Sequence, residues 1–130
     1  MEFNDVYKVV FVKCEETSLK FFTDMPGFKV YEKIEIQGKA CPVLQLNNGD
    51  FMMLIEREEI EADTIVVKTD DCLRDYYLFN KKNISDLTKP RYVARGLELC
   101  FSDPSGNQFV VIEERDYTEA WAIQLPKDEK

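Results

Sequence analysis

The sequence predicts an α+β domain in which a β-α-β-β-β unit occurs twice. The main observation is the stretch 101–113, FSDPSGNQFVVIE, which has the pattern of a tight turn between two strands. A weaker copy, GDFMMLIE, occupies residues 49–56. Both copies contain a turn-forming glycine followed by Asn or Asp, an unbroken apolar run, and a glutamate directly after an isoleucine. A duplication of about half the chain explains this pattern, and the order of the other elements supports it.

The composition is that of one folded domain. The chain has 130 residues, of which 45% are hydrophobic and 12% aromatic. A chain of this length buries roughly two-thirds of the surface that its unfolded form exposes, which is enough for one core. We therefore expect a single folded domain over residues 1–130, because the composition is not that of a disordered chain.

The charge of the chain limits its partners. The formal net charge is −8, and the sequence contains no histidine. Affinity for nucleic acid comes largely from Lys and Arg side chains that displace counterions from phosphates, so we expect no nucleic-acid partner. Negative charge attracts cationic ligands, although an acidic surface is first of all a solubility feature.

The cysteines and the N-terminus indicate a cytoplasmic protein. Four cysteines occur without a C-x-x-C pair, so we expect reduced thiols rather than a zinc knuckle or a disulfide scaffold. The first residues lack the basic and apolar segments of a secretory signal. No apolar run approaches the ~18 residues of a membrane span, so we expect no membrane contact.

The first half of the chain begins with a strand and a helix. Residues 6–13 are rich in Val and Phe and read as a buried strand. Polar residues at 15–18 supply candidate N-caps for a helix that continues through Asp24. Pro26 and Gly27 end this helix, and we expect its core-facing residues to be Leu19, Phe21 and Phe22.

Three strands follow, and the second half repeats the order. We expect strands at 29–36, 42–46 and 51–56, with NNGD at 47–50 as a hairpin turn. The equivalent elements of the second half are a strand at 64–69, a helix capped by Asp70 or Asp71 that continues through Lys82, and strands at 91–93, 97–102 and 108–114. This predicts modules at 6–57 and 63–116, joined by an acidic linker at 58–63.

The remaining segment, residues 117–130, contains Trp121, the only tryptophan of the chain. We expect this tail to pack on its own domain, with a position across a partner subunit as the alternative.

Two segments resemble the vicinal oxygen chelate superfamily, which includes glyoxalase I, extradiol dioxygenases, and the fosfomycin- and bleomycin-resistance proteins. SLKFFTDMPGFKV, at 18–30, is similar to the first helix and following strand of that family. DPSGN, at 103–107, is similar to its last hairpin. The resemblance extends over nearly the whole chain. It implies two βαβββ modules whose strands form a curved mixed sheet around a cleft.

The resemblance also implies four positions at which metal-dependent members carry His or Glu ligands. Counted from the two segments, these positions hold Lys8, Met53, Val110 and, with Asp63 as the alternative, Thr64. An ammonium, a thioether, an isopropyl group and one oxygen do not form a site for Zn, Fe, Mn or Ni. We therefore predict no metal, no other cofactor and no catalytic residue, and a ligand-binding role for these four side chains.

A few other residues have alternative roles. Lys8 either pairs with a ligand carboxylate or is simply exposed. Cys14 lies near a predicted helix N-terminus, which favours a thiolate, but a packed thiol is the simpler interpretation. Glu56 and Glu113 are equivalent in the repeat, and we expect them at strand ends in solvent, with a role in the cleft as the alternative.

Our main hypothesis is a metal-free, non-catalytic protein of the bleomycin-resistance type that sequesters a small molecule, for example an antibiotic or toxin. The acidity of the chain and its apolar cleft favour a cationic or aromatic ligand. The resemblance implies a homodimer with ligand at the subunit interface. One alternative is a glyoxalase-, epimerase- or dioxygenase-type lyase or isomerase with an atypical metal site. Another is an interaction domain without a pocket of ligand size.

Overall fold

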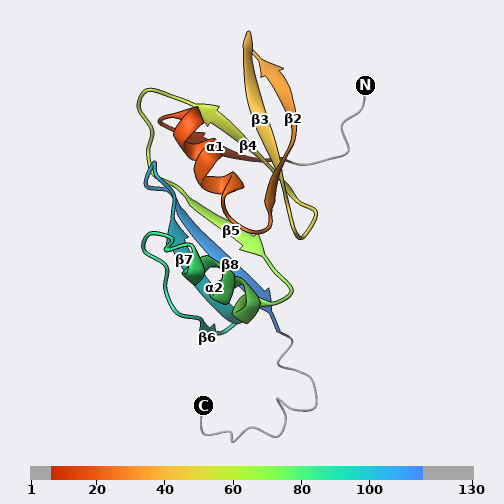
Figure 1. Cartoon of the computed structure of the whole chain (residues 1–130), viewed down its shortest axis with the longest axis vertical. Coiled ribbons are helices and arrows are strands. Elements are labelled where there is room, and N and C mark those ends of the chain that lie inside the picture. Colours follow the sequence, from red (N-terminus) through yellow and green to blue (C-terminus); the bar gives the residue numbers. More distant parts are fainter. Residues whose placement is uncertain (1–6, 116–130) are drawn as a thin grey trace, which may run out of the picture.

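The structure is a computed structural model and describes residues 7–115. The first module consists of β1 (Tyr7–Val12), α1 (Glu15–Thr23), β2 (Phe28–Ile36), β3 (Lys39–Leu46) and β4 (Phe51–Glu56). The second consists of β5 (Thr64–Lys68), α2 (Cys72–Lys81), β6 (Arg91–Val93), β7 (Gly96–Ser102) and β8 (Gln108–Glu114). The predicted order of elements is therefore present twice (Figure 1). The predicted tail with Trp121 lies outside the described residues.

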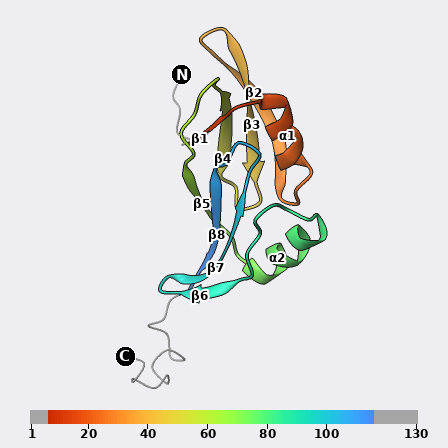
Figure 2. The ribbon, with the colours of Figure 1, turned by 90° about the vertical axis from the view of Figure 1, so that its left-hand side faces the viewer.

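Each module forms its own four-stranded sheet, in the orders β1-β4-β3-β2 and β5-β8-β7-β6. β1 runs parallel to β4 and β5 runs parallel to β8, while the other neighbouring strands are antiparallel. Both helices lie on the same side of the two sheets, and the opposite side carries no helical layer (Figure 2). The predicted α+β class is confirmed, with the strands divided between two mixed sheets.

Each helix begins against a glutamate from the last strand of its own module. Glu56 Oε1 accepts the N–H of Glu15 at 3.0 Å, and Glu113 Oε1 accepts the N–H of Cys72 at 2.9 Å. A carboxylate at this position satisfies an otherwise free N–H group and interacts favourably with the positive end of the helix dipole. Both glutamates lie at strand ends as expected. Glu56 is exposed, but the Glu113 side chain is only 21% exposed and is therefore not in solvent as expected. Their capping role is an additional finding.

The two N-caps differ from each other. α2 follows Asp71, whose side chain accepts the N–H of Arg74 at 3.0 Å, as the sequence predicts. α1 follows Cys14, whose side chain makes no capping hydrogen bond, so the polar residues 15–18 lie inside the helix and not at its cap. The carboxylate of Glu56 compensates for this weak cap, which sequence alone did not reveal.

The core lies between the helices and the sheets and continues from one module into the other. Phe22 is fully buried, and Leu19 and Phe21 are partly buried against the same core. Five phenylalanine rings form a continuous series, which we call the aromatic arc. Its successive centroid distances are 5.4 Å for Phe28–Phe22, 5.2 Å for Phe22–Phe109, 5.1 Å for Phe109–Phe101 and 5.6 Å for Phe101–Phe79. Because Phe22 and Phe109 come from different modules, the packing of their rings helps to join the two modules.

Asn107, in the β7–β8 turn, is the main polar link between the modules. Its side chain is 1% exposed, and its Nδ2 donates to the carbonyl of Phe11 at 2.9 Å and to Asp103 Oδ2 at 3.0 Å. Its Oδ1 accepts the N–H of Asp63 at 2.9 Å. One buried amide thus connects β1, the linker and the last hairpin.

The equivalent turn of the first module makes the reciprocal contact. Asn48 Nδ2 donates to the carbonyl of Lys68 at 2.8 Å, so each β-hairpin turn binds the first strand of the other module. Asn48 is exposed to solvent, in contrast to Asn107.

We expect Asn107→Ala to lower the free energy of unfolding by about 2–4 kcal/mol, because the Phe11 carbonyl and the Asp63 N–H lose a buried partner. Urea denaturation measures this change. Asn48→Ala is the control, and we expect it to cost less than about 1 kcal/mol because water replaces the lost partner. Equal losses in the two variants would contradict the central role of Asn107.

Candidate functional site

The side of the sheets that faces away from the helices is the candidate site. We call it the open face. Side chains alternate along a strand, so each strand sends every second residue to this side. Its apolar residues include Tyr7, Val9, Phe11, Val43, Phe51 and Met53 on the first sheet, and Val66, Val110 and Ile112 on the second. Several are strongly exposed for their type, including Val9 and Val66, each at 43%.

Three of the four predicted site residues lie on the open face. Met53 pairs with Val9, and Val110 pairs with Val66, so the two modules present equivalent pairs. Thr64 is exposed on the same side, but it pairs with Gln108. The residue of β5 that faces Val110 is Val66, so the predicted register was two residues early in this strand. Met53, at 6% exposure, is the most enclosed of the three.

Lys8 lies on the other side of the first sheet. It pairs with Met52, which belongs to the core beneath the helices, so the residue that faces Met53 is Val9. The predicted register was therefore one residue early at this position. The run from Val9 to Val12 is apolar on both faces and shows no alternation from which the register could be read.

The open face of the first sheet is apolar and aromatic. Cys41, Val43 and Met53 form a small buried cluster, against which Tyr7, Ile34, Phe51 and Ile55 pack. The Phe51 ring lies 4.7 Å from that of Tyr31 and 5.5 Å from that of Tyr7, measured between centroids. This surface can bind an apolar or aromatic group by stacking and by exclusion of water.

The open face of the second sheet contains a hollow of about 290 Å³. It is lined by Val66, Val93, Ala94, Arg95, Glu98, Val110 and Ile112. Glu98 accepts from Arg91 Nε at 3.1 Å and from Nη2 at 3.0 Å. Arg95 and Glu98 were not predicted as site residues. Glu98 stands between Leu97 and Leu99, and this alternation indicates that it lies on the opposite side of the strand from them.

Charged groups at the rim of this hollow are also paired. Glu114 forms ion pairs with Arg95 and, at 3.4 Å, with Lys68. The hydrogen bond from Arg95, followed by that from Lys68, lowers the pKa of the Glu114 carboxyl. The negative charge of the chain is therefore locally neutralised beside the hollow.

The open face does not fit a metal ion. The paired positions carry hydrocarbon groups and one thioether, at Val9, Met53, Val66 and Val110. Within residues 7–115, no three His, Cys, Asp or Glu side chains come together as a possible metal shell. Zn, Fe, Mn and Ni sites require nitrogen, oxygen or thiolate ligands, and such ligands do not meet here.

The cysteines differ in reactivity. Cys14 is exposed, so the interpretation of a packed thiol is wrong. Its Sγ accepts from Thr17 Oγ1 at 3.2 Å, a hydrogen bond that lowers the pKa of the thiol. Burial raises the pKa of Cys72 to about 12 and also raises the pKa of Cys100. The thiolate is the reactive form, so Cys14 is favoured by both accessibility and acidity.

We expect iodoacetamide at neutral pH to modify Cys14 first. The rate of modification should rise with pH and reach its plateau at a lower pH than for a free thiol. Peptide mass spectrometry after short exposure identifies the modified residue. Thr17→Val removes the hydrogen bond and should move the pH profile upward, whereas Thr23→Val, on the far turn of α1, should leave it unchanged. Preferential modification of Cys100 would contradict this assignment.

No helix between residues 7 and 115 has the length and apolar character needed to cross a membrane.

Known proteins share the fold rather than the sequence. No protein-family model matches the chain, and the curated proteins contain no significant match. Among solved structures, the antibiotic binding protein TnmS3 from Streptomyces sp. CB03234 is 17% identical. It has a TM-score of 0.74 and covers 88% of this chain and 98% of its own.

Two further solved structures also share the fold at low sequence identity. A member of the glyoxalase/bleomycin resistance protein/dioxygenase superfamily from Sphaerobacter thermophilus DSM 20745 is 21% identical, with a TM-score of 0.69 over 87% of this chain and 98% of its own. A bleomycin-binding protein, solved in complex with bleomycin, is 13% identical, with a TM-score of 0.70 over 87% and 100%. The chain therefore has the fold of the glyoxalase/bleomycin-resistance/dioxygenase superfamily, as the sequence predicted.

Proposed function

We propose that this protein binds and sequesters a small organic molecule on its open face, without a metal and without catalysis. The observation that carries this proposal is the chemistry of the two equivalent pairs, Val9 with Met53 and Val66 with Val110. Hydrocarbon and thioether groups suit an apolar ligand surface and offer no general acid, base or nucleophile. Thr64, on the open face, supplies a hydroxyl at the edge of this apolar surface.

The similar structures support a drug or toxin as the ligand class. TnmS3 is an antibiotic binding protein, and another relative in fold was solved with bleomycin bound. In this chain, the rings of Tyr7, Tyr31 and Phe51 favour an aromatic group. The net charge of −8 favours a cationic one over the long range, although the charges beside the second hollow are paired. A cytoplasmic location remains a prediction from the sequence.

We also propose that the open face is completed by a second copy of the chain. Val9, Phe11 and Val66 are exposed apolar residues of this face, at 43%, 37% and 43% exposure. Exposed apolar surface of this kind is typical of an interaction site. A homodimer would cover it and would enclose a ligand between two sheets.

We expect Val66→Glu to convert a dimer into a monomer, because the charge would enter the subunit interface without a partner. Light scattering after size-exclusion chromatography measures the mass. Leu73→Glu is the matched control, since Leu73 is 59% exposed on α2, on the other side of the second sheet. A wild-type monomer, or equal disruption by both variants, would contradict an interface on the open face.

Ligand binding has its own test. In a thermal-shift panel of antibiotics and aromatic cations, we expect hits that persist in EDTA and are lost in Val110→Glu, which places a charge on the apolar surface. Leu73→Glu should retain them. If EDTA abolishes the stabilisation and a divalent metal restores it, the alternative of a lyase or isomerase with an atypical metal site is correct. A panel without any hit would favour the interaction-domain alternative.

A further inference from the structure

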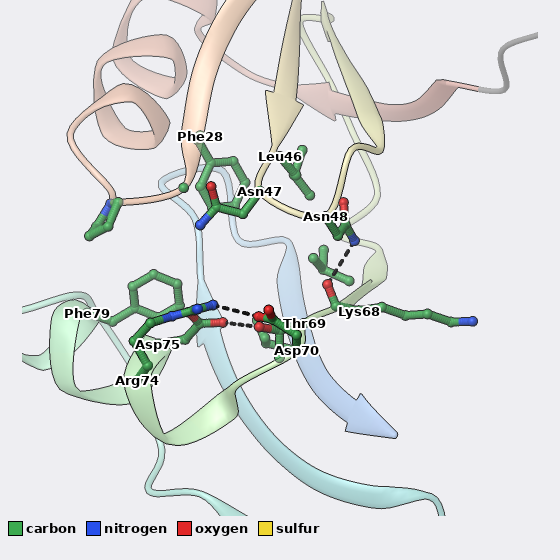
Figure 3. A pocket seen from close by; sticks show the side chains of 14 residues that line it. Phe28, Leu46, Asn47, Asn48, Lys68, Thr69, Asp70, Arg74, Asp75 and Phe79 are labelled. Atoms are coloured by element: carbon green, nitrogen blue, oxygen red, sulfur yellow. Dashed lines mark hydrogen bonds and ion pairs between the residues drawn. The ribbon is translucent and has the colours of Figure 1, made fainter. Parts of the chain in front are cut away.

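A larger cavity lies away from the open face, at the junction of the two modules. Its volume is about 650 Å³, within the range of about 300–1,000 Å³ typical of small-molecule sites. The first module contributes the turn before β2 and the β3–β4 turn, and the second contributes the end of β5 and residues along α2 (Figure 3). The lining includes Gly27, Phe28, Asn47, Asp70, Arg74 and Phe79.

The apolar part of the cavity is formed by the two ends of the aromatic arc. Phe28 ends the arc in the first module and Phe79 ends it in the second, and both line the cavity. Leu46, Val67 and Val111 add aliphatic surface between them. An aromatic ring bound here would continue the ring packing of the core.

The polar part of the cavity is a preorganised charged group at the start of α2. Arg74 Nη2 donates to Asp70 Oδ1 at 2.9 Å and to Asp75 Oδ1 at 3.1 Å. Asp75 is 8% exposed and also accepts from the Thr69 hydroxyl at 2.5 Å (Figure 3). Two carboxylates share one guanidinium, so this wall is net negative and favours a positive ligand group.

Lys68 does not neutralise this wall. Its ammonium points away from the cavity (Figure 3) and pairs with Glu114 at 3.4 Å. The side chain of Asp70 is 85% exposed, so its carboxylate is accessible to a ligand.

The mouth of the cavity is kept open by a glycine beside an asparagine. A Cβ atom at Gly27 would lie 2.9 Å from Asn47 Nδ2, and Gly27 has a φ of +94°. The Asn47 side-chain amide makes no hydrogen bond within residues 7–115, so it is available to a ligand.

The opposite junction of the two modules is closed, and neutral residues stand there in place of Arg74 and Asp75. There, Phe22 occupies the position that Phe79 has in the second module, and its ring packs directly on Phe109 at 5.2 Å. Thr17 and Ser18 stand at the positions of Arg74 and Asp75. The charged group is thus present only at the junction that is open.

We propose that this cavity is a second binding site, specific for a small aromatic cation, with the ring between Phe28 and Phe79 and the positive group at Asp70. A cation is additionally favoured by the faces of the phenylalanine rings. The site is independent of the ligand that we propose for the open face.

Three indoles test the charge preference. The three compounds have the same indole ring and side chains of similar length, but tryptamine is cationic, tryptophol is neutral and indoleacetate is anionic. We expect tryptamine to bind most tightly and indoleacetate most weakly in titrations followed by amide NMR of the full chain. The shifted amides should include those of Gly27, Asn47 and Arg74. Absence of tryptamine binding, equal affinities, or shifts confined to Val66 and Val110 would overturn the proposal.

Substitutions locate the site. Asp70→Asn should weaken tryptamine by about fivefold and leave tryptophol unchanged, as expected for one exposed ion pair. Glu58→Gln, which makes the same charge change in the exposed linker, is the control. Asn47→Trp should fill the cavity and abolish binding of both indoles, whereas Val110→Glu on the open face should abolish neither. Equal effects of Asp70→Asn and Glu58→Gln, or loss of binding only in Val110→Glu, would overturn the assignment.

Discussion

The most buried polar link between the two modules is the side chain of Asn107, which acts together with the Phe22–Phe109 ring contact and the Asn48–Lys68 hydrogen bond. Its amide satisfies the carbonyl of Phe11, the N–H of Asp63 and one oxygen of Asp103, and almost none of it is exposed to water. A buried polar group is stable only when its hydrogen bonds are made, so the three segments that it joins have one favourable arrangement. That arrangement places both helices on one side and leaves the open face on the other (Figure 2).

The repeat is approximate, and the differences between the two copies produce the functional features. Both modules cap their helix with a glutamate from the last strand, and both present an equivalent apolar pair on the open face. Asn48 and Asn107, in the two hairpin turns, each bind the first strand of the other module, but only Asn107 is buried. Asn107 lies in a closed junction packed with phenylalanines, while Asn48 lies beside the open cavity.

The two surfaces have different chemistry. The open face is lined by Val, Met and aromatic residues, and the ionic groups near it are paired with one another. The cavity combines two phenylalanines with a charged group in which acids exceed bases. Burial of apolar surface therefore dominates binding at the first, and charge complementarity contributes to selectivity at the second.

The sequence by itself determined the elements and their order. Strong local signals, such as NNGD, Asp71 before a helix and the DPSGN turn, set strand and helix ends to within a few residues of those observed. Local sequence did not determine which side of a strand faces the cleft when both sides are apolar, and for this reason Lys8 was placed on the wrong side of β1.

Only the tertiary structure decided how residues distant in sequence meet. The capping of Glu15 by Glu56, the contact of Asn107 with Phe11, and the cavity between Phe28 and Phe79 each require two segments far apart in the chain. Periodicity and turn chemistry report local preferences. These contacts depend instead on how the two modules pack, which no short segment encodes.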